Sequence, residues 1–116
     1  MISYKNRFHG HSSLDYVYRN GQTTRSHLVN IKSVVNKKRD ESRIAVVIGK
    51  KVVKSAVNRN RARRRVYEYI RPRIDQFDTV RDVVIIITSS ELISLPHEEL
   101  SSQLEQLLQQ SGIMGK

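Results

Sequence analysis

Basic side chains gather in one short stretch of the chain. Residues 50–73, KKVVKSAVNRNRARRRVYEYIRPR, hold ten Lys or Arg and one acid, which gives +9 of the chain's net charge of +10. Residues 1–49 carry +6 and residues 74–116 carry −5. Such a concentration of one charge repels itself unless a polyanion is bound, and the planar guanidinium of arginine can bind two phosphate oxygens at once. The stretch predicts a nucleic-acid surface, and its charge alone does not separate DNA from RNA.

No set of side chains suited to catalysis or to metal binding stands out. His9 and His11 form a His-x-His pair, but no third ligand lies at a suitable spacing. His27 and His97 are isolated, and the acids after residue 74 belong to predicted loops or to the first turn of a helix. The chain has no cysteine, which excludes disulfides and thiolate metal sites. We therefore expect no catalytic residue, no metal ligand and no cofactor tightly bound by the protein.

Length and composition predict a single domain over residues 1–116. Apolar residues make up 38% of the 116 residues, which suits a globular domain with a large polar surface. The N-terminus has no apolar segment of signal-peptide length, and the longest apolar runs, 44–48 and 83–87, are too short to cross a bilayer. We expect a cytoplasmic protein with no membrane partner.

Local patterns predict an α+β arrangement. Helices are expected over residues 12–19, from the N-cap at residue 55 to about 70, and from 96 to 112; strands are expected over 28–35, 43–48 and 82–88, with room for a short one around 50–54. The helix-end signals are Ser12 or Ser13, Asn20-Gly21, Ser55, Pro72, Pro96 at a first helical position, and Gly112.

The order of these elements predicts how they assemble. The strands at 28–35 and 43–48 flank the charged turn NKKRDES and predict a hairpin. The last helix carries one apolar stripe, Leu100, Leu104, Leu107 and Leu108. Residues 1–10 are expected to be an irregular arm and 111–116 a frayed tail. The result is a two-layer sandwich, a sheet with helices packed on one face.

The basic helix at 56–70 divides into two sides. At about 100° per residue its apolar residues, Ala62, Val66, Tyr69 and Ile70, share one sector and are expected to pack on the sheet. Arg61, Arg64 and Arg65 project roughly the opposite way, and Arg59 and Arg63 fall near the edge of the apolar sector, flanking Asn60. A solvated helix face would need acids to pair with these five arginines, and the helix has only Glu68. The helix therefore predicts a phosphate-binding side.

After the strand at 43–48, the basic stretch carries in order Lys50-Lys51, Ala56-Val57, Arg59-Asn60-Arg61 and Arg63-Arg64. This pattern resembles the protein subunit of bacterial ribonuclease P, the enzyme that removes the 5′ leader from precursor tRNA. The resemblance extends to Arg7-Phe8, Leu14, Val17, Tyr18 and Gly21 near the N-terminus, and to the apolar strand and leucine-striped helix near the C-terminus, so that it covers about residues 5–110.

The resemblance implies a fold and a set of contacts. The fold is α-β-β-β-α-β-α, like the second domain of ribosomal protein S5, with a left-handed β-α-β crossover where general rules favour the right hand. The partners implied are the catalytic RNA and precursor tRNA, with Mg²⁺ held mainly by the RNA and no obligate protein partner. The residues expected to bind the catalytic RNA are Lys50, Lys51, Lys54, Arg59, Asn60, Arg61, Arg63, Arg64 and Arg65.

The resemblance also implies that the single-stranded leader binds between the first helix and the sheet. The residues expected there are Arg7, Phe8, Leu14, Tyr18, Val29 and Ile31. Single strands bind proteins by stacking bases on aromatic rings and by backbone electrostatics. The chain departs from the family pattern at two positions: Leu14 stands where the family often has an aromatic residue, and Tyr67 stands where it commonly has an arginine. Tyr16, on the other side of the first helix from Leu14, is interpreted as a plain surface residue.

Two other functions fit parts of the pattern. A small ribosomal or ribosome-associated protein shares the size, the charge and often the α+β sandwich. A standalone metal-dependent nuclease would need a cluster of oxygen ligands for metal ions, which the sequence does not display.

Overall fold

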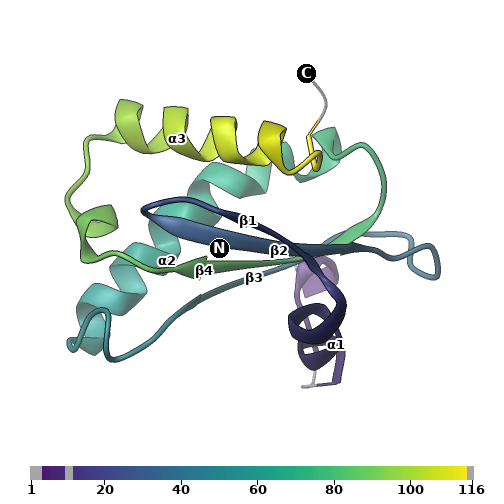
Figure 1. The fold of residues 1–116 in the computed structure, drawn as a ribbon, viewed down its shortest axis with the longest axis horizontal. Helices are drawn as coiled ribbons and strands as arrows, with labels where there is room; N and C mark the ends of the chain where they lie inside the picture. The colour runs from purple at the N-terminus through teal and green to yellow at the C-terminus, as the bar shows by residue number, and fades with distance from the viewer. Residues whose placement is uncertain (1–3, 10–11, 115–116) are drawn as a thin grey trace.

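The computed structural model describes residues 4–9 and 12–114, which form helices and strands around one four-stranded sheet (Figure 1). In chain order the elements are the 3-10 helix η1 (Tyr4–Asn6), α1 (Ser12–Asn20), β1 (Gln22–Arg25), β2 (Val29–Val35), β3 (Arg43–Ile48), α2 (Ala56–Ile70), the 3-10 helix η2 (Arg71–Gln76), β4 (Arg81–Ile87), the 3-10 helix η3 (Ser90–Ile93) and α3 (His97–Gln110). The predicted α+β class and the order α-β-β-β-α-β-α are confirmed. Among the described helices, none is long and apolar enough to cross a membrane.

The strands lie side by side in the order β1-β2-β4-β3. β2 pairs with β1 and β4 in antiparallel fashion, and β3 pairs with β4 in parallel. The predicted hairpin of β2 with β3 is therefore wrong, because β4 lies between them. β4 suits an inner position because Val83, Val84 and Ile85 are all fully buried, on alternating faces. α2 makes the crossover between the parallel strands β3 and β4, and the left hand expected for it stays a prediction.

The strand missing from the sequence interpretation is β1. It is four residues long, polar and mostly exposed, so neither alternation nor an apolar run marks it. The short strand expected around residues 50–54 is wrong, because a turn follows Gly49 there. Gly21 joins α1 to β1 at a close approach: a Cβ on it would lie 2.6 Å from the carbonyl oxygen of Val17 and 3.2 Å from the amide nitrogen of Ser33.

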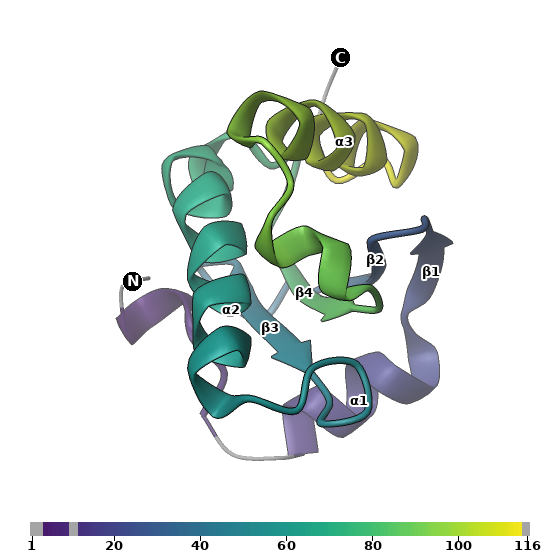
Figure 2. The ribbon, with the colours of Figure 1, turned by 90° about the vertical axis from the view of Figure 1, so that its left-hand side faces the viewer.

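Helices lie on both faces of the sheet. Figures 1 and 2 show α2 and α3 over one face and the shorter α1 on the opposite face. Most of the apolar core lies under α2 and α3, where the leucine stripe of α3 and the apolar side of α2 are buried as predicted. Val17 of α1 and Val84 of β4 are fully buried outside that core, which places them between α1 and the sheet. The prediction that all helices pack on one face of the sheet therefore holds for α2 and α3 and is wrong for α1.

The ends of the helices follow most of the local signals. The Ser55 hydroxyl accepts a hydrogen bond from the Asn58 amide at 3.3 Å and caps α2, which ends two residues before Pro72. Gly112 follows α3 with φ +78°. α1 begins at Ser12, so Ser12 and Ser13 lie inside its first turn, and the capping position lies outside the described residues. Pro96 precedes α3 by one residue and is not its first helical residue.

Both ends of the described chain are packed. Ile113 and Met114 are buried, and the Asp78 amide donates to the Ile113 carbonyl at 3.1 Å, so the frayed tail predicted from residue 111 is wrong up to residue 114. Near the N-terminus, the buried Asn6 side chain donates to the Ser42 carbonyl at 2.8 Å, and Arg7 forms a parallel bridge with Ile44. Residues 6–8 of the predicted irregular arm therefore lie beside the start of β3, at its outer edge.

Candidate nucleic-acid interface

Two arginines of α2 project freely into solvent. Arg61 and Arg64 are exposed, and within residues 4–9 and 12–114 neither forms a hydrogen bond or an ion pair. Glu68, the one acid of the helix, lies 3.6 Å from Arg71 and pairs with it. The opposite side of the helix is fixed in the core by Ala62, Val66, Tyr69 and Ile70, so these two guanidinium groups stand on a rigid base and remain available to an anion.

Two further arginines of the motif make local contacts. The Arg59 guanidinium donates to the carbonyl oxygens of Val53 and Lys54 at 2.9 and 2.7 Å, which ties the loop before α2 to the helix. That loop carries Lys50, Lys51 and Lys54, all exposed. Arg63 donates to the Asn60 side-chain oxygen. Both arginines are half-buried, so each can shape the surface as well as carry charge.

Arg65 is used inside the fold. Its guanidinium donates to the carbonyl oxygens of Leu92, Ile93 and Leu95 at 2.6, 3.1 and 2.5 Å. These carbonyls belong to η3 and to the segment leading to α3, so Arg65 fastens that segment to α2. The sequence interpretation grouped Arg65 with the RNA-binding arginines, and its structural role depends on acceptors about thirty residues away that no local pattern reveals.

The tyrosines of α2 are also structural. The Tyr67 hydroxyl accepts a hydrogen bond from the Val46 amide at 3.1 Å and so covers part of the outer edge of β3. The Tyr69 ring is buried and lies 3.9 Å from the Arg73 guanidinium carbon; burial raises the pKa of the Tyr69 phenol, and the charge of Arg73 opposes that rise. At 5% exposure the Tyr69 ring is not accessible to a base.

On the face of the sheet that α1 covers, side chains form three rows across β2, β4 and β3. The register gives the rows Val34-Asp82-Arg43, Lys32-Val84-Ala45 and Asn30-Ile86-Val47. The buried pair Val17 and Val84 places α1 over the middle row. One flank of α1 therefore overlooks the first row and the other flank overlooks the third.

Leu14 and Tyr18 lie on the flank that overlooks the third row. The Tyr18 side chain is 39% exposed, and Lys32 lies over its ring, with Nζ 5.8 Å from the centroid and donating to the Tyr18 carbonyl at 3.2 Å. Burial of the ring and the nearby charge of Asp15 raise the pKa of the Tyr18 phenol above its ordinary value of 10. A neutral, partly exposed ring beside a lysine is suited to a base and its phosphate.

Val29 and Ile31 do not line this flank. Each is 1% exposed and belongs to the core under α2 and α3, because alternation along β2 points them to the opposite face from Lys32. The prediction that they contact the leader is therefore wrong. The half-buried side chains of Asn30, Val47 and Ile86 occupy the corresponding positions on the α1 face.

Phe8 and Arg7 lie nearer the first row. The Arg43 guanidinium carbon lies 4.8 Å from the centroid of the Phe8 ring, and Arg43 forms a buried ion pair with Asp82 through bonds of 2.9 and 2.6 Å. Arg7 is exposed beside β3. Phe8 and Tyr18 thus contact different rows of the sheet, and the structure does not bring all the predicted leader residues into one groove.

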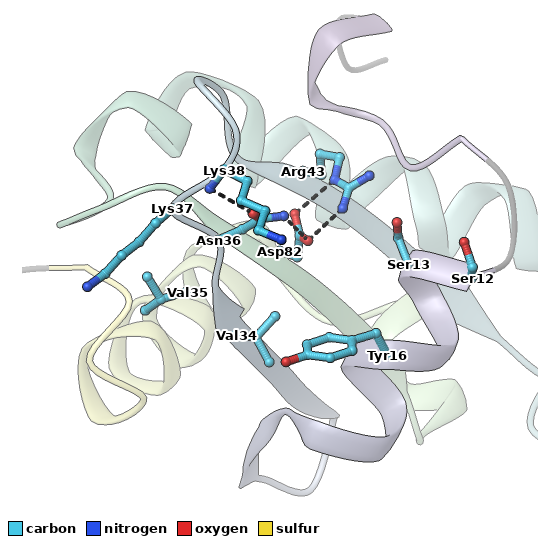
Figure 3. Close-up of a pocket in the computed structure, with 10 residues that line it drawn as sticks. All are labelled: Ser12, Ser13, Tyr16, Val34, Val35, Asn36, Lys37, Lys38, Arg43 and Asp82. Atoms are coloured by element: carbon cyan, nitrogen blue, oxygen red, sulfur yellow. Dashed lines mark hydrogen bonds and ion pairs between the residues drawn. The ribbon is translucent and has the colours of Figure 1, made fainter.

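A hollow of about 600 Å³ lies on the other flank of α1, over the first row (Figure 3). Tyr16, Val34 and Lys38 are among the residues that line it. The sequence interpretation left Tyr16 as a surface residue, because nothing in the local pattern shows that the β2–β3 loop rises beside it.

Metal ligands do not gather in the described part of the chain: no group of three or more His, Asp or Glu side chains is placed to hold an ion. His11 lies outside the described residues, so the His9 and His11 pair is not assessed. The exposed His27 side chain forms a hydrogen bond with the Glu91 carboxylate at 2.7 Å, which joins the β1–β2 turn to η3.

The family model with the description "Ribonuclease P" matches residues 2–112. Among curated proteins, the ribonuclease P protein component of Pseudanabaena sp. is 27% identical over 98% of this chain and 97% of its own length. That of Synechocystis sp. is 32% identical over 84% of this chain and 78% of its own length. The match to the Chloroflexus aggregans protein, 36% identical, spans 56% of that protein's length.

Solved structures show the same fold at lower identity. The ribonuclease P protein of Staphylococcus aureus superposes with a TM-score of 0.83 at 18% identity, covering 95% of this chain and 98% of that one. The protein from Thermotoga maritima gives a TM-score of 0.78 at 21% identity, covering 90% of this chain and 96% of that one.

Proposed function

The chain belongs to the ribonuclease P protein family, whose members take part in an endoribonuclease complex with the ribonuclease P RNA, and from this premise we propose how it acts there. It docks on the catalytic RNA through the solvent-facing side of α2 and the lysine loop before it. It holds the 5′ leader of precursor tRNA beside α1, and so aids removal of the leader. The hydrolysis itself is assigned to the RNA, with Mg²⁺ held mainly by RNA oxygens.

The observation that carries the proposal is the division of α2 into two sides. One side is buried against the sheet, and the other presents Arg61 and Arg64, which pair with no acid among the residues that the structure describes. Lys50, Lys51 and Lys54 extend the same positive region. Phosphate groups of a folded RNA supply the missing counter-charges, and binding releases the cations condensed on them.

The leader is proposed to lie on the flank of α1 that carries Leu14 and Tyr18. Tyr18 offers a stacking surface, Lys32 offers a charge beside it, and the half-buried Val47 and Ile86 offer an apolar floor. Contacts of this kind recognise a single strand with little dependence on its sequence. Leu14 replaces one aromatic surface with an aliphatic one, so we expect the flank to depend on Tyr18 for stacking.

The chemistry fits a supporting role for the protein. The described residues do not supply a cluster of oxygen ligands that could hold Mg²⁺ for phosphodiester hydrolysis. The positive surface instead screens the repulsion between two RNAs, which lowers the magnesium concentration that the complex needs. A cytoplasmic location and the lack of an obligate protein partner stay predictions.

Reconstitution tests the proposal. The protein is mixed with the catalytic RNA of a bacterial ribonuclease P and a precursor tRNA at low Mg²⁺, and leader release is followed. We expect cleavage to require the RNA and to rise when the protein is added. Cleavage by the protein and Mg²⁺ without RNA would assign catalysis to the protein, and no effect on the RNA's activity would favour the ribosomal alternative.

A further inference from the structure

We propose that the hollow on the Tyr16 flank of α1 is a second nucleotide site, which holds an unpaired nucleotide of the catalytic RNA. The inference rests on the proposed function, because it takes the same RNA as partner, and it assigns that RNA a contact far from the arginines of α2. The site is named here the Tyr16 groove and is lined chiefly by Tyr16, Val34, Val35, Lys37 and Lys38 (Figure 3).

The walls of the groove supply an apolar surface for a base. Tyr16 is 58% exposed and Val35 is 45% exposed, and both belong to the four large hydrophobic residues that are exposed in the described part of the chain. Val34 lies between them in Figure 3 and is half-buried. An exposed aromatic ring beside aliphatic side chains is the surface on which an unpaired base stacks.

Positive charge lies at one wall. Lys37 and Lys38 are exposed at the end of β2 and belong to the lining. Neither pairs with an acid in the described part of the chain. The first turn of α1 closes the opposite wall with Ser12 and Ser13, and the N–H groups of a helix start also favour an anion.

The floor of the groove is neutral and fixed. Asp82 is the acid in the lining, and both of its oxygens are occupied: Oδ1 accepts from Arg43, and Oδ2 accepts from Arg43 and from the Asn36 side chain at 2.8 Å. Asn36 also accepts from the Lys38 amide at 3.2 Å, so the carboxylate holds the start of the lysine loop in place. The floor therefore does not repel a phosphate, and the lysines rest on an ordered support.

The occupant is assigned to the catalytic RNA because of where Tyr16 points. At about 100° per residue, Tyr16 and Tyr18 project about 160° apart on α1. The buried pair Val17 and Val84 fills the space between α1 and the sheet, so a strand beside Tyr18 does not pass beneath the helix to reach Tyr16. A second strand is needed, and the RNA partner supplies it.

The test measures the affinity of the full chain for the catalytic RNA by filter binding. We expect Tyr16→Ala to weaken binding about fivefold to a hundredfold, the value of one base stacked on an aromatic ring, and Tyr16→Phe to restore it. The double variant K37A/K38A should lower the slope of log affinity against log salt by about 1.4, as two contacts to a single strand require. Because Tyr16 is 58% exposed, its variants should keep the melting temperature of the unaltered chain.

Each other result overturns the assignment in a recognisable way. Equal RNA affinity for Tyr16→Ala and the unaltered chain rejects the site and leaves the proposed function standing. Failure of the unaltered chain to bind the RNA rejects both. If Tyr16→Ala changes only the preference for leader-bearing over leaderless precursor tRNA, the occupant is the leader. If it changes only self-association without RNA, the occupant is a second copy of the chain.

Discussion

The buried ion pair under the Tyr16 groove gives a stability prediction with a built-in control. Arg43 and Asp82 have side chains only 6% and 4% exposed. Three donors converge on the Asp82 carboxylate, two from Arg43 and one from Asn36. In Asp82→Asn the amide has one oxygen and an NH₂ group, so at least one donor faces another donor and the Arg43 charge loses its counter-charge. Breaking a buried pair in this way costs about 3–5 kcal/mol, and we expect about 3 because the shape is kept.

The matched control is Asp78→Asn. Asp78 also accepts two hydrogen bonds from one arginine, Arg81, at 2.9 and 3.1 Å, but its side chain is 45% exposed. Water replaces those contacts, so its loss should cost less than about 1 kcal/mol. The same chemical change is therefore compared in a buried carboxylate and in one that is 45% exposed.

Urea unfolding followed by circular dichroism measures both variants. The midpoint should fall much further for Asp82→Asn than for Asp78→Asn, with the slope of the transition unchanged. In thermal unfolding, about 3 kcal/mol corresponds to roughly 12 °C for a domain near this length. Equal effects of the two substitutions, or a cost for Asp82→Asn below about 1 kcal/mol, would refute the reasoning.

Three further predictions concern single side chains. Arg65→Lys keeps the charge, but a lysine side chain cannot reach all three carbonyl oxygens that Arg65 binds. The substitution should therefore lower the free energy of unfolding in urea by about 2 kcal/mol and leave RNA affinity nearly unchanged. A large loss of affinity would show that Arg65 contacts the RNA. Ser55→Ala removes the cap of α2 and should cost about 1 kcal/mol, whereas no loss would show that the cap is dispensable. Hydrogen bonds and charge from Arg81 lower the pKa of Asp78 below its ordinary value of 3.8, so its contribution to stability is present above that value and is lost as pH falls through the lower folded pKa. The stability gap between Asp78→Asn and the unaltered chain should therefore narrow as pH falls below 3.8, and a constant gap would contradict this.

The sequence predicted the parts of the fold that local chemistry decides. Ser55 and Pro72 mark the two ends of α2, because a capping residue and a proline act on their immediate neighbours. The leucine stripe of α3 lies in the core because its spacing fits one helix face. The arginine side of α2 followed from the same periodicity.

What the sequence did not reveal depends on partners distant along the chain. β1 is recognisable only once β2 offers it a partner, and β2 and β3 separate only because β4 inserts between them. The alternation of side chains along β2 indicates two faces of the strand, but it does not tell which face α1 covers. Val29 and Ile31 were therefore predicted on the α1 face, whereas they lie in the core on the opposite face. Arg65 looked like its neighbours because its acceptors lie beyond β4.

The central claim is that the solvent side of α2 docks on the catalytic RNA, and a salt titration of RNA affinity tests it most directly. We compare R61A/R64A with R19A/R25A, a control that removes the same two charges from exposed positions on α1 and β1. We predict that R61A/R64A lowers the slope of log affinity against log salt by about 1.4 to 1.8, as the loss of two phosphate contacts requires, while the control changes it little. Equal slopes for the two double variants would show that only net charge matters, and would contradict this claim.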